Sequence, residues 1–564
     1  AGAIPPLVGL LRRMTHSNSP RATKYAAVAL QTLADGNADN KVAMAGAIPP
    51  LVALLTASKG VLQEKAAAAL GDIAVENASN QVAMAEAGAI PRLVANATYG
   101  ATAAIRDKAA AAAWVLALSS SERRVVAIPA LVELLTCGGG VLQEKAAATL
   151  WGMAATVENR SAIAEGGAVR PLVSLVTSGT AEAQENAAGT LWNLSCGSSE
   201  NKAAIAKAGA IPALVALLGN DNKGSSSKGG GAKANAAGAV RNLASDDDVV
   251  RRELHFFKKA IPGLVALLRS DDDVVVAKEN AAAALYHLAE ACGKAIAEAG
   301  ATGPLVTLLT SDSAVARRNA AAALWKITTT ESDAGVGAVA PLVEMLKATD
   351  EGSAYAAGAL AHLARRAESR SAILTENNAI PSLVALLAID VAEENAAAAL
   401  ANLAKDAQLK IAAAGAIPPL VALLSSKKKK TKEKAAAALA NVAKSPATRG
   451  AMAGAIPSLV ALLSVSGAER YAAAALRNLA GSFAAAIADA GGIPPLVALL
   501  RSADAQKYAA GALAHLASDG PATRAAINAA AAYKPLRDLA EHAQCEGDTK
   551  TYASLALKRL QQRD

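Results

Sequence analysis

Aromatic residues are scarce in this chain of 564 residues, at 3% of the sequence, whereas hydrophobic residues make up 53%. A core with so few rings must be built from Ala, Leu, Val and Ile, whose side chains let helices pack closely. Long apolar runs are also missing, because stretches such as "AAAAAWVLAL" at 109–118 fall short of the ~18–20 residues needed to cross a bilayer. We therefore expect no membrane span.

Cysteine is equally rare, and the four cysteines, Cys137, Cys196, Cys292 and Cys545, lie far apart. None belongs to a CxxC pair or stands near a histidine at metal-ligand spacing, so we expect free thiols in a reducing compartment and no bound metal. This favours the cytoplasm, with the nucleus as the alternative. The first residues, "AGAIPPLVGLL", lack an initiator Met and begin inside a repeat, which we interpret as an excerpt or a processed chain.

Catalytic motifs are missing as well. The sequence contains no phosphate-binding glycine loop with Lys and Ser or Thr, no HExxH and no nucleophile elbow. The glycine-rich stretch "CGGGVLQEK" at 137–145 lacks the required spacing and is interpreted as a loop. We expect a protein that is not an enzyme, has no catalytic residues and needs no cofactor.

The sequence consists instead of one repeated unit. The phrase "ENAAGTLWNLS" at 185–195 returns as "ENAAAALANLA" at 394–404 and "RYAAAALRNLA" at 470–480, with a period of roughly forty residues. Such a period indicates a solenoid. A repeat array also suits the length, because a single globule of this size would exceed the limit at which one core keeps growing.

A second phrase alternates with the first: "GAIPPLVALL" at 46–55 and 415–424, "GAIPALVALL" at 209–218 and "GGIPPLVALL" at 491–500. Gly suits the left-handed residue that closes one helix, and Pro suits the first turn of the next. A short helix such as "ENKAAIAKA" at 200–208 precedes this corner. Each unit is therefore expected to contain a short helix, a corner, a second helix, a loop and a longer third helix.

This three-helix pattern resembles the armadillo-repeat family over essentially the whole chain. The resemblance implies an all-α, right-handed superhelical solenoid of about 14 three-helix repeats, and we expect residues 1–564 to form a single such solenoid. It is similar to vacuolar armadillo adaptors and plant armadillo proteins, and more distantly to β-catenin and importin-alpha.

We define the reference position of each repeat as the residue that matches Asn193. The fourteen reference residues are spaced by 36 to 49 residues. In chain order they are Thr32, Asp72, Val115, Gly152, Asn193, Asn242, His287, Lys326, His362, Asn402, Asn441, Asn478, His515 and Arg559. The first helices at 119–126 and 330–337 are eroded, and the Gly- and Ser-rich insertion at 219–231 is expected to be a mobile loop.

Helical geometry predicts which side of the third helix is buried. At 100° per residue, the residues two before and one after the reference position mark the buried side, and the reference residue points roughly 130° away from it. The residues four and seven before the reference position lie within about 40° of it. We expect these three positions to form one exposed stripe. The position four before is Ala or Gly in twelve of fourteen repeats, so a visiting backbone could approach closely.

The family resemblance implies that third helices line a concave groove, where a recurring Asn holds the main chain of an extended peptide. An amide suits this role because it is both donor and acceptor. The alternative is that each Asn bonds only to a neighbouring repeat. The predicted groove residues are Asn193, Asn242, His287, Lys326, His362, Asn402, Asn441, Asn478 and His515, with Lys65, Lys108, Lys145 and Lys434 seven residues before the reference position. The three histidines are too far apart to share a metal ion.

Aromatic residues concentrate at the position just before the reference residue. It holds Trp114, Trp151, Trp192, Tyr286 and Trp325. Trp is enriched among binding hot spots, so these rings are candidates for an aromatic flank of the groove. The alternative, left open here, is that each indole covers the neighbouring repeat and stabilises the stack.

Basic residues outnumber acidic ones in the predicted groove, and the formal net charge of the chain is +8. The leading hypothesis is a protein-interaction scaffold that binds an extended, acidic segment of a protein partner, with no small-molecule substrate. A structural subunit of a cytoskeletal or ciliary assembly is an alternative, as is a nuclear-import adaptor, although the Trp expected four residues before the Asn is never present. Nucleic-acid binding is not expected, because "KKKK" at 427–430 lacks nearby stacking aromatics.

Overall fold

The computed structural model describes residues 2–14, 19–117, 128–129, 131–136, 140–219, 229–270, 274–328, 336–541 and 547–562. Every regular element in these ranges is a helix, and none is a strand, which confirms the all-α repeat solenoid. The chain forms two compact units, Ala1–Ala295 and Ile296–Asp564, and each is described by itself.

The repeat around Asn193 and Asn242 shows the expected order of helices. Helix α13 (Ala181–Leu194) is followed by the short helix α14 (Ser199–Lys207), then α15 (Ala210–Leu218) and α16 (Gly229–Ala244). The hydroxyl of Ser198 accepts a hydrogen bond from the Asn201 backbone N–H at 3.1 Å and caps α14. Gly209, at φ +80°, makes the left-handed turn between α14 and α15, so the predicted corner is confirmed here.

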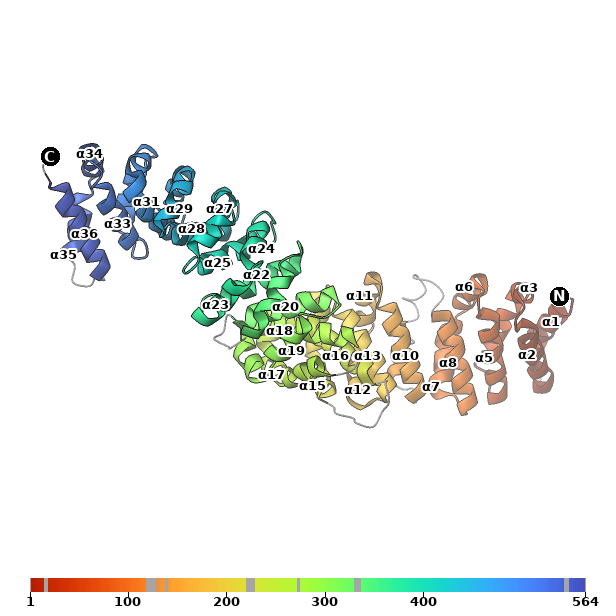
Figure 1. Ribbon diagram of the computed structural model, residues 1–564. Coiled ribbons are helices and arrows are strands. Elements are labelled where there is room, and N and C mark those ends of the chain that lie inside the picture. The colour runs from red at the N-terminus through yellow and green to blue at the C-terminus, as the bar shows by residue number, and fades with distance from the viewer. Residues whose placement is uncertain are drawn as a thin grey trace. The chain divides into compact units, whose positions relative to one another are not determined.

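In the first unit the third helices stack in chain order, α2 on α5, then α8, α10, α13 and α16, as Figure 1 shows. These helices are α2 (Pro20–Ala34), α5 (Gly60–Ala74), α8 (Ala103–Ala117), α10 (Gly140–Met153), α13 and α16. The first and second helices pack beside them: α1 (Ile4–Met14), α3 (Ala38–Ala43), η1 (Ala45–Ala47), α4 (Ile48–Leu54), α6 (Ala78–Glu86), α7 (Ala89–Tyr99), α11 (Val157–Glu165), α12 (Val169–Ser178), α14, α15 and α17 (Asp247–Arg269). Helix α18 (Val275–Glu298) is kinked at Cys292.

In the second unit the stack runs α20, α22, α25, α28, α31, α33 and α36. Their bounds are α20 (Ala314–Thr328), α22 (Glu351–Leu363), α25 (Glu393–Leu403), α28 (Lys429–Val442), α31 (Glu469–Asp489), α33 (Gln506–Leu516) and α36 (Gly547–Leu560). The remaining elements are α19 (Thr302–Leu308), η2 (Val336–Ala338), α21 (Val339–Met345), α23 (Ala367–Thr375), α24 (Ala379–Leu386), α26 (Gln408–Ala413), α27 (Ile417–Leu423), α29 (Pro446–Arg449), η3 (Gly450–Ala455), α30 (Ile456–Leu462), α32 (Ile493–Leu499), α34 (Pro521–Ala529) and α35 (Tyr533–Glu541).

The buried side of the third helices is the predicted one. Leu191 and Leu194, two before and one after Asn193, are fully buried in α13. Leu400 and Leu403 occupy the same positions around Asn402 and are also fully buried. Apolar burial on this side supplies the main stabilising free energy of each repeat, at roughly 25 cal/mol per Å² of apolar surface removed from water.

Not every corner has the predicted geometry. Gly46 does not adopt a left-handed conformation but lies in the 3-10 helix η1. Gly209 is the eighth residue after Asn201, whereas Gly46 is the sixth after Asn40, so the shorter segment leaves no room for the full turn. In α17 the corner glycine is replaced by Lys259, and the first and second helices merge into one element of 23 residues with a non-helical residue at Glu253.

The predicted loop at 219–231 is described only at its ends. Residues 229–231 belong to α16, and residues 220–228 lie outside the described part of the chain. The eroded segment at 119–126 also lies outside it, as does most of 330–337, although Val336–Ala338 forms η2.

No single helix among the described residues has both the length and the apolar composition needed to span a membrane. Two bent pairs, α14 with α15 and α31 with α32, meet these criteria only when taken together.

Candidate functional site

The asparagines at the reference position form a ladder of hydrogen bonds between successive third helices. In each case the side-chain Nδ2 donates to the backbone carbonyl of the residue just before the reference position of the preceding repeat. The bonds are Asn193 to Trp151 (3.3 Å), Asn242 to Trp192 (3.2 Å), Asn402 to Ala361 (2.8 Å), Asn441 to Ala401 (2.8 Å) and Asn478 to Ala440 (2.9 Å). One donor of every predicted groove asparagine is therefore used inside the stack.

A second ladder runs parallel to the first, seven residues earlier on each helix. Its bonds are Asn186 to Glu144 (3.4 Å), Asn235 to Glu185 (3.0 Å), Asn280 to Ala234 (3.2 Å) and Asn395 to Ala354 (2.8 Å), again from Nδ2 to a backbone carbonyl of the preceding repeat. We call the surface that carries the two ladders the ladder face. Two helical turns separate the ladders, so both lie on one side of each third helix.

The ladder asparagines differ in whether their Oδ1 atom can still accept a hydrogen bond from a bound peptide. Within the described residues, the Oδ1 atoms of Asn193, Asn402 and Asn441 accept no hydrogen bond. Oδ1 of Asn478 accepts from Arg477 at 3.3 Å (Nε) and 3.1 Å (Nη2), and Oδ1 of Asn242 accepts from Nε and Nη2 of Arg241, both at 3.2 Å. The first three asparagines thus keep an acceptor for a visiting N–H group.

The position four before the reference residue is not an exposed stripe, which corrects the sequence-based prediction. Gly189, Gly238 and Gly358 are buried there. A Cβ atom added at Gly238 would lie 2.6 Å from Cδ2 of Trp192, and one added at Gly358 would lie 2.8 Å from Nε1 of Trp325. In these repeats the space beside the glycine is filled by a tryptophan of the preceding repeat, the one that stands just before its reference residue. The backbone of a bound peptide therefore cannot enter there.

The predicted aromatic flank is half-buried at all of its members, Trp114, Trp151, Trp192, Tyr286 and Trp325. Trp151, Trp192 and Trp325 each pack on a glycine of the next repeat. Trp114 lies near the Lys145 ammonium, which is 5.8 Å from its ring centroid, and its buried Nε1 has no hydrogen-bond partner among the described residues. The four indoles therefore contact neighbouring repeats while remaining partly exposed.

The predicted basic residues fall into two groups. Lys65 and Lys434 form ion pairs with the adjacent Glu64 and Glu433, at 2.8 Å and 3.0 Å. Lys108 and Lys145 are exposed, and Lys326 is half-buried with its Nζ 5.7 Å from the Trp325 ring centroid. Local carboxylates thus neutralise part of the charge that the sequence predicts for this surface.

The histidines at the reference position all have a lowered pKa. Burial lowers the pKa of His287 to about 4, with further contributions from the positive charges of Arg241 and Lys202. Burial also lowers the pKa of His362 to about 4, and its Nδ1 has no hydrogen-bond partner among the described residues. The pKa of His515 is lowered by burial and by Arg559, Arg477 and Arg449. The described residues include no cluster of three or more metal-ligating side chains.

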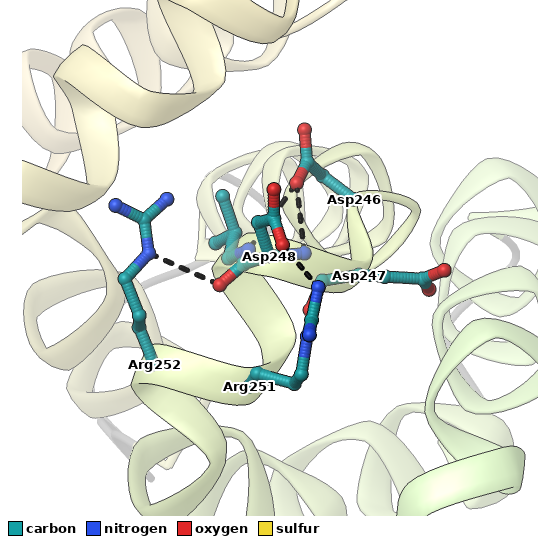
Figure 2. Close-up of polar contacts among 6 residues, drawn as sticks. Asp246, Asp247, Asp248, Arg251 and Arg252 are labelled. Carbon is teal, nitrogen blue, oxygen red and sulfur yellow. Dashed lines mark hydrogen bonds and ion pairs between the residues drawn. The ribbon is translucent and has the colours of Figure 1, made fainter.

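The acidic residues Asp246–Asp248, close to His287, make hydrogen bonds and an ion pair within their own helix α17. Figure 2 shows that the Asp246 carboxylate caps α17, accepting from the backbone N–H groups of Asp248 at 3.1 Å and Val249 at 3.2 Å. Arg251 pairs with the Asp248 carboxylate. Asp247 points away from this cap in Figure 2, and its charge opposes the lowering of the His287 pKa.

The family model for the armadillo/beta-catenin-like repeat matches residues 156–196, 294–329, 407–444 and 484–518. Each match contains one reference residue of the ladder face, namely Asn193, Lys326, Asn441 and His515. This chain is an armadillo-repeat protein. Its armadillo repeats make it a protein-binding scaffold in the broad sense.

One solved structure of similar shape agrees with this assignment of the armadillo-repeat fold. One structure, described in connection with a phosphorylation switch that controls the interaction between cadherin and beta-catenin, has a TM-score of 0.55 at 14% identity, covering 99% of this chain and 100% of that chain. An engineered protein from the Northeast Structural Genomics Consortium is 32% identical with a TM-score of 0.45, covering 77% of this chain and 99% of that one. No curated protein sequence matches the chain.

Sequence reasoning missed a row of cations on this armadillo-repeat protein. Arg365, Lys405 and Lys444 stand three residues after the reference position in three consecutive repeats, and all are exposed. The recurring phrases "HLAR" (362–365), "NLAK" (402–405) and "NVAK" (441–444) carried the signal. Cations at the C-terminal ends of α22, α25 and α28 also interact favourably with the helix dipoles.

Proposed function

We propose that this armadillo-repeat protein is an interaction scaffold that binds an extended, acidic segment of a partner protein on the ladder face, in the cytoplasm or the nucleus. The observation that carries the proposal is the pair of unused Oδ1 atoms on Asn402 and Asn441, in consecutive repeats of the second unit. Each can accept a hydrogen bond from a main-chain N–H of a visiting segment. Because the ladder bonds fix each amide, little side-chain entropy is lost on binding.

The charge around these asparagines supports an acidic partner. Arg365, Lys405 and Lys444 form no ion pair within the described residues, and Lys108 and Lys145 are exposed on the same face of the first unit. Carboxylates on a partner would be attracted to either set of cations and would gain free energy as they approach it.

The test compares the native protein with the N402A/N441A double variant. Each protein is used as bait with extract from native tissue, captured proteins are cross-linked, and cross-linked residues are mapped by mass spectrometry. We expect cross-links from an acidic segment to lysines of the ladder face, such as Lys405 and Lys434, and reduced capture by the variant. Partners that cross-link only to first helices, with equal capture by both baits, would favour the role of a structural subunit.

A further inference from the structure

The second unit contains an arginine that shares its local motif with the first unit but not its surroundings. Arg241 and Arg477 both precede a ladder asparagine, in the phrases "VRNLA" (240–244) and "LRNLA" (476–480). Each guanidinium donates through Nε and Nη2 to Oδ1 of that asparagine. The asparagine therefore loses its free acceptor, and the guanidinium takes its place on the ladder face.

Whether Nη1 of the guanidinium also donates a hydrogen bond depends on the side chain that the next repeat places beside it. Nη1 of Arg241 donates to Oδ1 of Asn280 at 3.0 Å, so all three nitrogens of this guanidinium donate to side chains of the stacked helices. The position equivalent to Asn280 beyond Arg477 is Tyr508, and within the described residues no hydrogen bond joins Arg477 to it. Within the described residues Nη1 of Arg477 donates no hydrogen bond, which leaves a charged donor available at the surface.

Two tyrosines and a glycine fix the orientation of Arg477. Its guanidinium carbon lies 5.2 Å from the ring centroid of Tyr508 and 5.9 Å from that of Tyr552. Its aliphatic stem covers Gly511, where an added Cβ would lie 2.7 Å from Cδ. A guanidinium fixed in this way is preorganised, so binding an anion costs little conformational entropy.

Further positive charge lies beside Arg477 and is not neutralised. The pKa of Lys444 is lowered by partial burial and by the charges of Arg477 and Lys405. Arg477, together with Arg559 and Arg449, also contributes to the lowered pKa of His515. Asp548, whose pKa Arg477 helps to lower, is already paired with Lys507 at 2.6 Å. Bringing an anion to this place would therefore relieve repulsion among the cations.

We propose that Arg477 and Lys444 form an anion-binding subsite that holds a carboxylate side chain of an extended segment of a partner protein. The inference rests on the proposed function, since it places one acidic residue of the same segment. Stacked helices lie ~8–10 Å apart and an extended chain advances ~3.3 Å per residue, so one repeat matches about three residues. The carboxylate should therefore stand about three residues from the residue whose N–H binds Asn441.

The test uses two fluorescein-labelled peptides of alternating Ser and Ala that differ only in carrying two glutamates or two glutamines. Fluorescence anisotropy with the full chain gives the ratio of their affinities. We expect the native protein to prefer the glutamate peptide and R477Q and K444A each to lower the ratio about ten-fold, as for loss of one charge-assisted hydrogen bond. K410A, which removes an exposed lysine from the short helix α26, is the matched control and should leave the ratio unchanged.

Circular dichroism melts confirm that each variant is folded, and R477K serves as a second variant that keeps the charge but loses the fork of donors. An unchanged ratio in R477Q and K444A, with binding of both peptides weakened in N402A/N441A, would overturn the subsite and leave the proposed function standing. Failure of the native chain to bind either peptide would overturn both. A single-stranded oligonucleotide that displaces the glutamate peptide more strongly than unlabelled peptide would overturn the assignment to a protein partner.

Discussion

The indole of Trp192 packs against Gly238 of the next repeat, where a Cβ atom would lie 2.6 Å from Cδ2 of the ring. The same relationship joins Trp151 to Gly189 and Trp325 to Gly358. In all three pairs the tryptophan stands just before one reference position and the glycine stands four residues before the next. The pairing explains why glycine interrupts otherwise favourable helices, since alanine would give higher helix propensity but no space for the ring.

Replacing Gly238 by Ala should destabilise the first unit. The methyl group forces Trp192 out of its position, and overpacking of this kind costs about 1–3 kcal/mol, more than the ~1 kcal/mol gained in helix propensity. Chemical denaturation measures the change in the free energy of unfolding. The control is G152A, because a Cβ at Gly152 meets no atom within 4 Å and should be neutral or stabilising.

The coupling between the two residues gives a sharper test. The W192A variant should lose stability alone, by about 2 kcal/mol for a half-buried ring. Once the indole is removed, however, G238A should no longer lower the free energy of unfolding. A double-mutant cycle should therefore show a coupling free energy of about 1 kcal/mol or more. Strictly additive effects would mean that the close approach has no energetic consequence.

The same tryptophan variants separate packing from binding. Because Trp151 and Trp192 are half-buried against the next repeat, we expect W151A and W192A to lower the melting temperature. Affinity for a captured partner, measured well below the melting temperature, shows whether the exposed edges of the rings also contact the partner. Loss of affinity without loss of stability would assign the rings to binding alone and contradict the packing role.

Asn441 should contribute to stability through its hydrogen bond to the Ala401 carbonyl at 2.8 Å. Replacing it by Ala leaves that buried carbonyl without its partner and should cost about 1 kcal/mol. Replacement by Asp should cost more, since a carboxylate oxygen would face the carbonyl oxygen. Denaturant titration of both variants checks this order, and an Asp variant as stable as the native protein would contradict the ladder geometry.

Stability should fall as the pH drops from 6.5 to about 4. In the folded state burial lowers the pKa of His287 and His362 to about 4, whereas in the unfolded chain each titrates near 6.5. Between these values the unfolded state binds more protons, so acidification favours unfolding, by on the order of 3 kcal/mol per histidine. Above pH 6.5 both states are neutral and the effect vanishes.

Thermal melts across this pH window measure the effect. The H287Q and H362Q variants should show a smaller fall in melting temperature than the native protein, whereas H255Q, which changes an exposed histidine of α17, should behave like the native protein. Equal slopes in all four proteins would mean that other groups control the acid response.

Association with an acidic partner should slow as salt rises. Lys108 and Lys145 are exposed and contribute to the attraction at distances up to the Debye length, about 10 Å at 0.1 M salt. Stopped-flow measurements with K108A/K145A should show a several-fold lower association rate at low salt and little difference at high salt. K207A, which changes an exposed lysine of the short helix α14, is the control, and an association rate independent of salt would exclude steering.

The fold could be predicted largely from local sequence. The forty-residue period, the glycine at the corner before Ala210, and the fully buried pair Leu191 and Leu194 all follow from helical geometry within one repeat. The prediction of the corner was wrong at Gly46, because the preceding helix α3 has six residues there, against nine in α14, and the turn tightens. Local geometry is determined by a few adjacent residues, and those residues are visible in the sequence.

The candidate site could be predicted only in part. The sequence identified the recurring asparagines and tryptophans but left open whether they face a ligand or a neighbouring repeat. The structure shows that each amide gives one donor to the preceding repeat, that three indoles fill the space over glycines of the next repeat, and that Arg241 and Arg477 cover the acceptors of two asparagines.

The period and the helical faces of this protein are properties of a single repeat, so the sequence by itself determined them. The donors, acceptors and charges that remain free depend on how side chains of one repeat meet those of the next. Arg241 and Arg477 share the same local sequence, yet only Arg241 meets the acceptor of Asn280, while Arg477 meets Tyr508. Hydrogen bonds act over about 3 Å, so only the stacked tertiary structure could decide between a saturated and an available guanidinium.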